Sequence, residues 1–175
     1  MSNLKYKRIA FTGEAIQNKV TQLGAQIKND YEGEDLVLVS VLKGSTYFFA
    51  DLTRAIDLPI ELDFMAIGVY PHATAETGAV RITKDLDIDI SGKHVLVIED
   101  IIRTGLTIGY LVQNLKTRQP KSVKVATLLI NHDQQLIDGP IAYEGFQVTD
   151  TWLMGYGMDI EGKWRNLPYI VEITR

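Results

Sequence analysis

The stretch that decides the fold is Val95–Thr107, which reads VLVIEDIIRTGLT. Four consecutive aliphatic residues indicate a strand that is buried on both faces, as in a parallel sheet covered by helices. Two carboxylates, Glu99 and Asp100, stand where this strand should end. Because parallel α/β folds bind ligands beyond the carboxyl ends of their strands, we expect these acids to meet hydroxyl groups or a metal ion.

The segment after this strand has the composition of an anion-binding turn. Residues 103–107 are mostly small and polar, and Gly105 lets backbone N–H groups approach an anion closely. A helix should follow, since apolar residues between Ile108 and Leu115 recur on one face. A phosphate at its start would be favoured by free amides and by the helix dipole. The alternative is a strand, turn and helix with a solvated acidic end and no ligand.

Strands and helices alternate along the rest of the chain. The expected elements are helices over residues 14–29 and 46–54 and strands over 36–42, 60–67 and 123–130. Residues 70–79 lack periodicity and are expected to form a long loop of the kind that covers active sites. The tail from Pro140 contains short strand-like pieces. The alternation predicts an α/β fold with a central parallel sheet flanked by helices, in one domain over residues 1–175.

The composition is that of an ordinary globular protein. Of 175 residues, 46% are hydrophobic and 23% are charged, and the net charge of −4 gives no electrostatic reason to expect nucleic acid or a membrane as partner. The absence of cysteine excludes disulfides, a thiolate nucleophile and a cysteine zinc site. No apolar run approaches the ~20 residues of a membrane span, and no secretory signal is visible. We therefore expect a cytoplasmic protein.

Several ordered segments resemble one enzyme family. EDIIxTGxT after an aliphatic strand resembles the phosphoribosyl pyrophosphate (PRPP) motif of type I phosphoribosyltransferases, and the version with Ile-Ile is similar to that of the hypoxanthine-guanine phosphoribosyltransferases. Further matching segments are VLKGS (41–45), FFADL (48–52), DFM (63–65) and GYGMD (155–159). The resemblance implies the type I phosphoribosyltransferase fold. In that fold a small hood, formed here by the N-terminal part and residues 131–175, covers the ligand edge of the sheet.

The resemblance also implies a reaction. A 5-phosphoribosyl group would pass from PRPP to a 6-oxopurine, giving the nucleoside monophosphate and pyrophosphate, with Mg²⁺ as cofactor. The implied assembly is a homodimer or homotetramer whose partners are small-molecule substrates, without nucleic acid or membrane. Two alternatives are a transferase with a different acceptor, for example an anionic one, and a catalytically weakened regulator that binds PRPP or a nucleotide.

The family match assigns roles to individual residues. Glu99 and Asp100 would bind the ribose hydroxyls at the catalytic centre and, with Asp159, would hold Mg²⁺. The phosphate groups of PRPP would be bound by Lys43, Gly44, Arg103, Thr104, Gly105, Leu106, Thr107 and Arg165. The base would lie against Asn131, Trp152 and the backbone of Leu153, and Tyr70 of the mobile loop would close over the reaction. The alternatives for Lys43 and Trp152 are a surface lysine at a turn and a core aromatic residue.

Three positions depart from the family pattern. Val69 replaces a serine, so its hydroxyl contact to pyrophosphate is lost. Arg103 replaces an aspartate that takes or shares the proton of the base nitrogen, and arginine cannot act as a general base because it has no acceptor. Asn131 replaces a lysine that donates to the exocyclic oxygen of the purine, whereas an amide can donate or accept. The changes indicate either neutral drift or an altered choice of acceptor, with Arg103 attracting an anion.

Overall fold

The computed structural model describes residues 5–69, 80–136 and 139–174 of the chain. The helices are α1 (Gly13–Tyr31), α2 (Thr46–Ala55), α3 (Leu106–Lys116) and the 3₁₀ turn η1 (His132–Gln134). The strands are β1 (Lys5–Phe11), β2 (Leu36–Leu42), β3 (Glu61–Val69), β4 (Val80–Lys84), β5 (His94–Ile102), β6 (Ser122–Ile130), β7 (Ile141–Gln147), β8 (Trp152–Met154) and β9 (Ile170–Thr174). The helices and strands expected from periodicity are present, with ends within one or two residues of the prediction. Within the described ranges, no helix is long and apolar enough to span a membrane.

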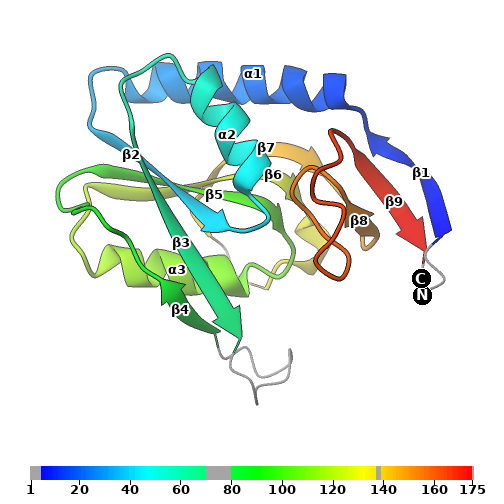
Figure 1. Cartoon of the computed structure of the whole chain (residues 1–175). Coiled ribbons are helices and arrows are strands. Elements are labelled where there is room, and N and C mark those ends of the chain that lie inside the picture. The colour runs from blue at the N-terminus through cyan, green and yellow to red at the C-terminus, as the bar shows by residue number, and fades with distance from the viewer. Residues whose placement is uncertain (1–4, 70–79, 137–138, 175) are drawn as a thin grey trace.

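A six-stranded sheet in the order β4-β3-β2-β5-β6-β7 forms the centre of the molecule. Its neighbouring strands are parallel except for β3 and β4, which are antiparallel. Helices α1 and α2 cover one face of this sheet and α3 covers the other (Figure 1). The predicted α/β fold with a mostly parallel sheet between helices is confirmed.

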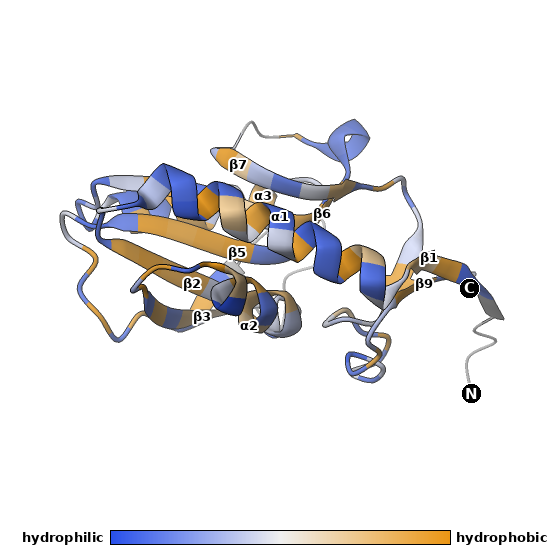
Figure 2. Cartoon of the chain, turned by 90° about the horizontal axis from the view of Figure 1, so that it is seen from above, coloured by the Kyte–Doolittle hydropathy of each residue, from blue (hydrophilic) through white to orange (hydrophobic). Residues whose placement is uncertain are grey.

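Strand β5 is buried on both faces, as its continuous aliphatic sequence predicted. Val95 and Val97 belong to the apolar cluster under α3, whereas Leu96 and Ile98 belong to the cluster under α1 and α2. All four side chains are completely buried, and burying each one stabilises the fold by about 1.5–3 kcal/mol. Figure 2 shows the apolar strands β2 and β5 running beneath α1. The strand that ends in the two carboxylates is therefore held firmly in the middle of the core.

A second sheet lies beside the main one and consists of antiparallel strands in the order β1-β9-β8 (Figure 1). Glu172 of β9, which is buried, pairs with Lys7 and Arg8 of β1 at 2.6 and 2.7 Å. Strand β7 falls within the range 131–175 that the resemblance assigned to the hood, yet it extends the main sheet. The small sheet therefore draws on β1, β8 and β9 alone among the described strands.

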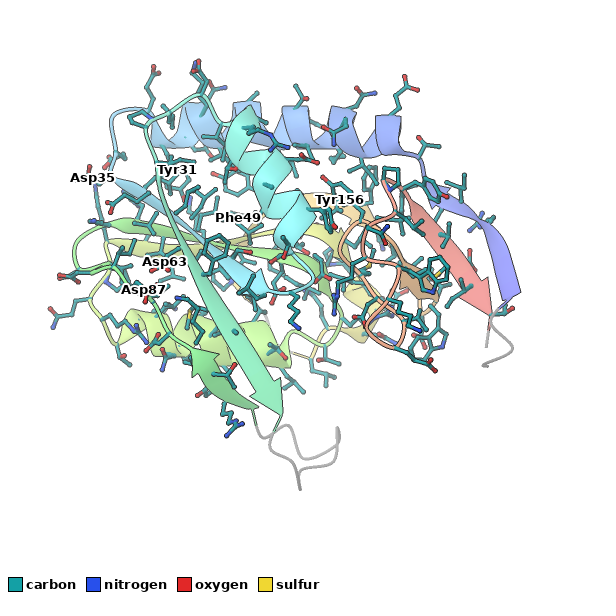
Figure 3. The ribbon with its side chains drawn as sticks, viewed as in Figure 1. Tyr31, Asp35, Phe49, Asp63, Asp87 and Tyr156 are labelled. Atoms are coloured by element: carbon teal, nitrogen blue, oxygen red, sulfur yellow. The ribbon has the colours of Figure 1, made fainter. Side chains whose placement is uncertain are left out.

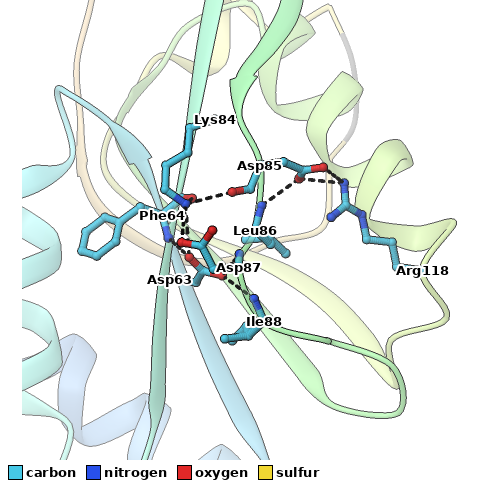
Figure 4. A network of polar contacts seen from close by, with 8 residues as sticks. All are labelled: Asp63, Phe64, Lys84, Asp85, Leu86, Asp87, Ile88 and Arg118. Atoms are coloured by element: carbon cyan, nitrogen blue, oxygen red, sulfur yellow. Dashed lines mark hydrogen bonds and ion pairs between the residues drawn. The ribbon is translucent and has the colours of Figure 1, made fainter.

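A buried carboxylate, Asp63, fixes the segment after β4 against β3 (Figure 4). It accepts hydrogen bonds of 2.7–3.1 Å from the backbone N–H groups of Phe64, Asp87 and Ile88. Burial alone would raise the pKa of Asp63, but these donors and the Lys84 ammonium 3.6 Å away lower it overall. The sequence indicated Asp63 only as part of a family motif, and the structure shows that it is a structural anchor.

Candidate active site

The site lies where the parallel strands β2 and β5 end side by side. One pocket follows β5 and is lined by Glu99, Ile101, Ile102, Arg103, Thr104, Gly105, Thr107 and Ile108. A second pocket is lined by Val41, Leu42, Gly44, Ile67, Gly68, Glu99, Asp100, Thr107 and Arg165. Because Glu99 and Thr107 line both pockets, the two adjoin one another at the expected edge of the sheet.

Two adjacent acids form the floor of this site. Glu99 is buried, and desolvation together with the neighbouring Asp100 carboxylate raises its pKa well above the ordinary value. Burial also raises the pKa of Asp100, although the Ile101 N–H, which donates to Asp100 Oδ1 at 2.9 Å, and the charge of Arg165 oppose this. Buried acids with perturbed pKa values in a pocket are typical of functional sites.

The turn after β5 has the geometry of an anion-binding loop. Gly105 has φ +77°, a left-handed conformation that glycine adopts without strain, and it is the N-cap of α3. Since glycine has no side chain, the first turn of α3 is not capped by its N-cap residue. Thr104, Leu106 and Thr107 are exposed around this helix start. A helix start of this kind is suited to a phosphate, and the phosphate site at this turn stays a prediction.

The loop after β2 packs directly on the acids. The Leu42–Lys43 peptide bond is cis, and Lys43 is exposed. Gly44 lies against Asp100 so closely that a Cβ atom at position 44 would overlap the carboxylate. Only glycine fits this position, because a larger residue would displace Asp100 from the pocket.

The segment 155–165 brings a third set of charges to the site. Arg165 Nη2 lies 2.6 Å from Asp159 Oδ1, and Arg165 Nη1 donates to the Gly157 carbonyl at 2.6 Å. Asp159 Oδ2 also accepts from the Gly162 N–H at 2.7 Å. Across the described ranges, no group of three or more His, Asp or Glu side chains is arranged to hold a metal ion. Arg165 lines the second pocket together with Asp100, and it pairs with Asp159.

Arg103 extends from the phosphate turn to the segment before β8. Its Nη2 donates to the Thr151 carbonyl at 2.8 Å, and its Nη1 lies 3.4 Å from Asp150 Oδ1. The next residue, Trp152, is half exposed, so the alternative that Trp152 is a core residue is wrong. Leu153 does point into the main apolar cluster.

Asn131 is almost completely buried at the end of β6. Its Oδ1 caps η1 by accepting from the Asp133 N–H at 3.1 Å. Its Nδ2 has no hydrogen-bond partner among the described residues. The amide therefore offers a donor rather than an acceptor, which the sequence left open. Tyr70 lies outside the described residues, and of Val69 only the backbone at the end of β3 is described.

One contact at the site was not anticipated from the sequence. Tyr156 Oη donates to Asp51 Oδ2 at 2.6 Å, which joins the segment 155–159 to α2. Figure 3 labels Tyr156 next to that helix. Asp51 also accepts from Gln17 Nε2 of α1 at 2.8 Å. Both Asp51 and Tyr156 belong to segments that resemble the family, but nothing local indicated that they pair.

A family model described as a phosphoribosyl transferase domain matches residues 11–161. The chain belongs to the phosphoribosyltransferase family. The hypoxanthine-guanine phosphoribosyltransferase of Mycobacterium tuberculosis is 44% identical over 170 residues, covering 94% of this chain and 84% of the relative. That of Bacillus subtilis is 41% identical over 164 residues, covering 94% and 91%. A crystal structure of a hypoxanthine-guanine phosphoribosyltransferase from Bacillus anthracis has a TM-score of 0.92 and 40% identity, covering 99% of this chain and 100% of that one.

These likenesses confirm the resemblance that EDIIRTGLT indicated. Within the phosphoribosyltransferases, this chain groups with the purine enzymes, and the likeness extends over both of its sheets. The departures at Arg103 and Asn131 therefore stand inside an otherwise matching purine phosphoribosyltransferase.

Proposed function

We propose that the chain transfers the 5-phosphoribosyl group of PRPP to a 6-oxopurine such as hypoxanthine or guanine, and releases pyrophosphate with the nucleoside monophosphate. The convergence of the loops after β2 and β5 with Arg165 around Glu99 and Asp100 carries this proposal. PRPP needs donors for its phosphates and acceptors for its ribose hydroxyls, and this edge supplies both. The names of the relatives indicate the same activity.

In this proposal each loop binds one part of PRPP. The 5′-phosphate lies at the start of α3, against the backbone of residues 103–107 and the hydroxyls of Thr104 and Thr107. Glu99 and Asp100 accept hydrogen bonds from the ribose hydroxyls, while Lys43, Gly44 and Arg165 hold pyrophosphate. As the bond from C1′ to pyrophosphate breaks, its electron pair leaves with pyrophosphate, and these cations and amides stabilise the growing charge. A ring nitrogen of the base then forms the new bond to C1′.

Mg²⁺ fits the site only together with the substrate. Asp159 is its proposed protein ligand, with Glu99 and Asp100 nearby. Mg²⁺ commonly uses one or two carboxylates, several waters and substrate phosphates, so the absence of a three-acid cluster among the described residues agrees with this role. When bound, the ion would neutralise charge on pyrophosphate. On binding the ion, Asp159 would give up its ion pair with Arg165.

Further parts of the proposal concern closure, the hood and assembly. Tyr70 closes over the reaction, and the small sheet β1-β9-β8 acts as the hood of a single domain. Leu62 and Phe64 are exposed on one side of β3, and Tyr47 of α2 is exposed as well. Such apolar side chains support a homodimer or homotetramer. The lack of cysteine fits a reducing compartment such as the cytoplasm.

A panel of bases tests the proposal. The protein is mixed with PRPP, Mg²⁺ and hypoxanthine, guanine, xanthine or adenine, and pyrophosphate release is measured. We expect release with the 6-oxopurines and little with adenine, since the Nδ2 of Asn131 is a donor. Tight PRPP binding by calorimetry without release with any base would instead favour a regulator.

A further inference from the structure

Arg103 is a fixed cation at the acceptor side of the site. It lines the pocket after β5, and its guanidinium bonds to the Thr151 carbonyl at 2.8 Å and lies 3.4 Å from Asp150. Thr151 directly precedes Trp152, the proposed base-stacking residue. The side chain therefore spans from the phosphate turn to the segment that would lie beside the base.

The chemistry of the acceptor makes this cation important. A neutral purine carries one N–H in its five-membered ring, and its proton must leave when the ring becomes bonded to C1′. Arginine has five donors, no acceptor and a charge at all working pH values, so Arg103 cannot receive that proton. Thr151 and Asp150 take two of its donors, and the others can bind only a lone pair or an anion.

Few other groups near Arg103 could take the proton. Glu99 is the sole further titratable side chain among the described residues that line this pocket. It is buried at the end of β5, and the proposed function already uses its carboxylate to accept from the ribose hydroxyls. Asp150 is 78% exposed and already paired with Arg103. Among the described residues, Asp150 is therefore the carboxylate that a test has to exclude.

We propose that Arg103 makes the acceptor site select purines that have already lost the proton of the five-membered ring. This inference rests on the proposed function and names its substrate class. In such an anion, a ring-nitrogen lone pair forms the bond to C1′ while the electron pair of the broken C1′–O bond leaves with pyrophosphate. No proton moves within the site, and the second ring nitrogen keeps a lone pair that can accept from Arg103. A neutral purine would have to release its proton to water.

Guanine and 8-azaguanine provide a matched pair of probes. They differ by one ring atom, and the extra nitrogen makes the five-membered ring of 8-azaguanine more acidic. We would measure kcat/KM for both bases, across neutral and mildly alkaline pH, in the natural protein and in Arg103→Asp, Arg103→Gln and Asp150→Asn. The natural protein should favour 8-azaguanine, and its rate with guanine should rise with pH. Arg103→Asp should remove the preference and raise the guanine rate, towards the ~10²–10⁴ range of general-base catalysis.

The remaining variants test whether the charge of Arg103, rather than its hydrogen bond to Thr151, causes the preference. Arg103→Gln keeps a donor for the Thr151 carbonyl but loses the charge, so the preference should fall while the KM for PRPP stays similar. Arg118→Gln is the control, because Arg118 follows the C-terminal end of α3, where it bonds to Asp85 (Figure 4) and to Asn114, and should change neither quantity.

Two results would overturn the inference while leaving the proposed function standing. One is equal kcat/KM for the two bases at every pH in the natural protein. The other is a large loss of guanine turnover in Asp150→Asn with 8-azaguanine unaffected, which would make Asp150 the proton acceptor. Absence of pyrophosphate release with every base would overturn the proposed function itself.

Discussion

Gly157 packs directly on the carbonyl oxygen of Gly44, so closely that a Cβ atom on Gly157 would overlap it. Gly157 also has φ +102°, in the left-handed region that favours glycine. Gly44 in turn lies against the carboxylate of Asp100. Three segments that are distant in the sequence thus meet: Gly157 and Gly44 through their backbones, and Gly44 and Asp100 through the Asp100 side chain. The pocket for pyrophosphate depends on that close approach.

Replacing Gly157 with alanine should therefore damage the site beyond its effect on the backbone. Gly33→Ala is the matched control, since Gly33 has φ +81° but an added Cβ would meet no atom within 4 Å. A left-handed alanine costs about 1–2 kcal/mol at either position. We expect Gly157→Ala to lose further stability in thermal unfolding and to raise the KM for PRPP, while Gly33→Ala keeps its kinetics. Unchanged kinetics in Gly157→Ala would contradict this account.

The contact between Tyr156 and Asp51 should position the pyrophosphate loop. Tyr143 offers a matched control, because it is equally buried and its hydroxyl donates to Asp30 at the same 2.6 Å, away from the site. Removing either hydroxyl should cost about 1.5–3 kcal/mol of stability, the usual worth of a hydrogen bond to a charged group. Only Tyr156→Phe should also raise the KM for PRPP. Equal kinetic effects of the two variants would show that the contact is merely structural.

Asp100→Asn should weaken PRPP binding. The variant keeps the shape of the side chain and an oxygen for the Ile101 N–H, so the fold should survive. Losing a charge-assisted bond to a ribose hydroxyl should cost about 1.5–3 kcal/mol, or tenfold or more in affinity. Calorimetry with Mg²⁺ present measures this directly, with the exposed turn residue variant Asp89→Asn as control. Identical affinities for PRPP would remove Asp100 from the ribose site.

Glu99 should make the protein less stable as the pH rises. Its pKa in the folded state is raised by burial and by Asp100, so the folded protein binds its proton more tightly than the unfolded chain does. Stability therefore falls from the unfolded carboxyl pKa of ~4.3 upwards, through the raised folded value. Glu99→Gln should raise the Tm at neutral pH, with a gain that shrinks towards pH ~4, while PRPP turnover falls. A difference in Tm between Glu99→Gln and the natural protein that is the same at all pH values would show that the titration of Glu99 is not its cause.

Asp159→Ala should increase the concentration of Mg²⁺ needed for half-maximal activity. Hard oxygen ligands and substrate phosphates suit Mg²⁺ and Mn²⁺, so either ion should support the reaction. The variant also frees Arg165 from its ion pair, which should keep pyrophosphate bound more tightly. Titrating both ions against initial rate measures the effect. Full activity of the natural protein in excess chelator would exclude a role for the metal.

Local pattern was enough to predict the centre of the fold. The aliphatic run before Glu99 indicated a doubly buried strand, and its acids and Gly105 follow at the edge where parallel sheets bind ligands. The directions of two polar side chains could not be predicted in the same way. Arg103 turns towards the Thr151 carbonyl, and Asn131 commits its oxygen to η1, because of neighbours that the sequence does not place beside them.

Contacts between segments that are far apart in the sequence could not be predicted either. Tyr156 and Asp51 are 105 residues apart, and both stand in segments whose resemblance was evident, yet no periodicity connects them. The same holds for β7, which lies in the range expected for the hood but completes the main sheet through its pairing with β6. Contacts of this kind arise only when the elements are assembled.

The central place of β9 in the small sheet determines when that sheet can form during protein synthesis. Strand β1 leaves the ribosome first, but its partner β9 comes only with residues 170–174 (Figure 1). Strand β8, which begins with Trp152, also waits for β9. The main sheet is complete by Gln147 and can fold earlier, since domains fold as their segments emerge. A nascent chain stalled before residue 170 should therefore have a formed PRPP edge without an ordered base-stacking strand.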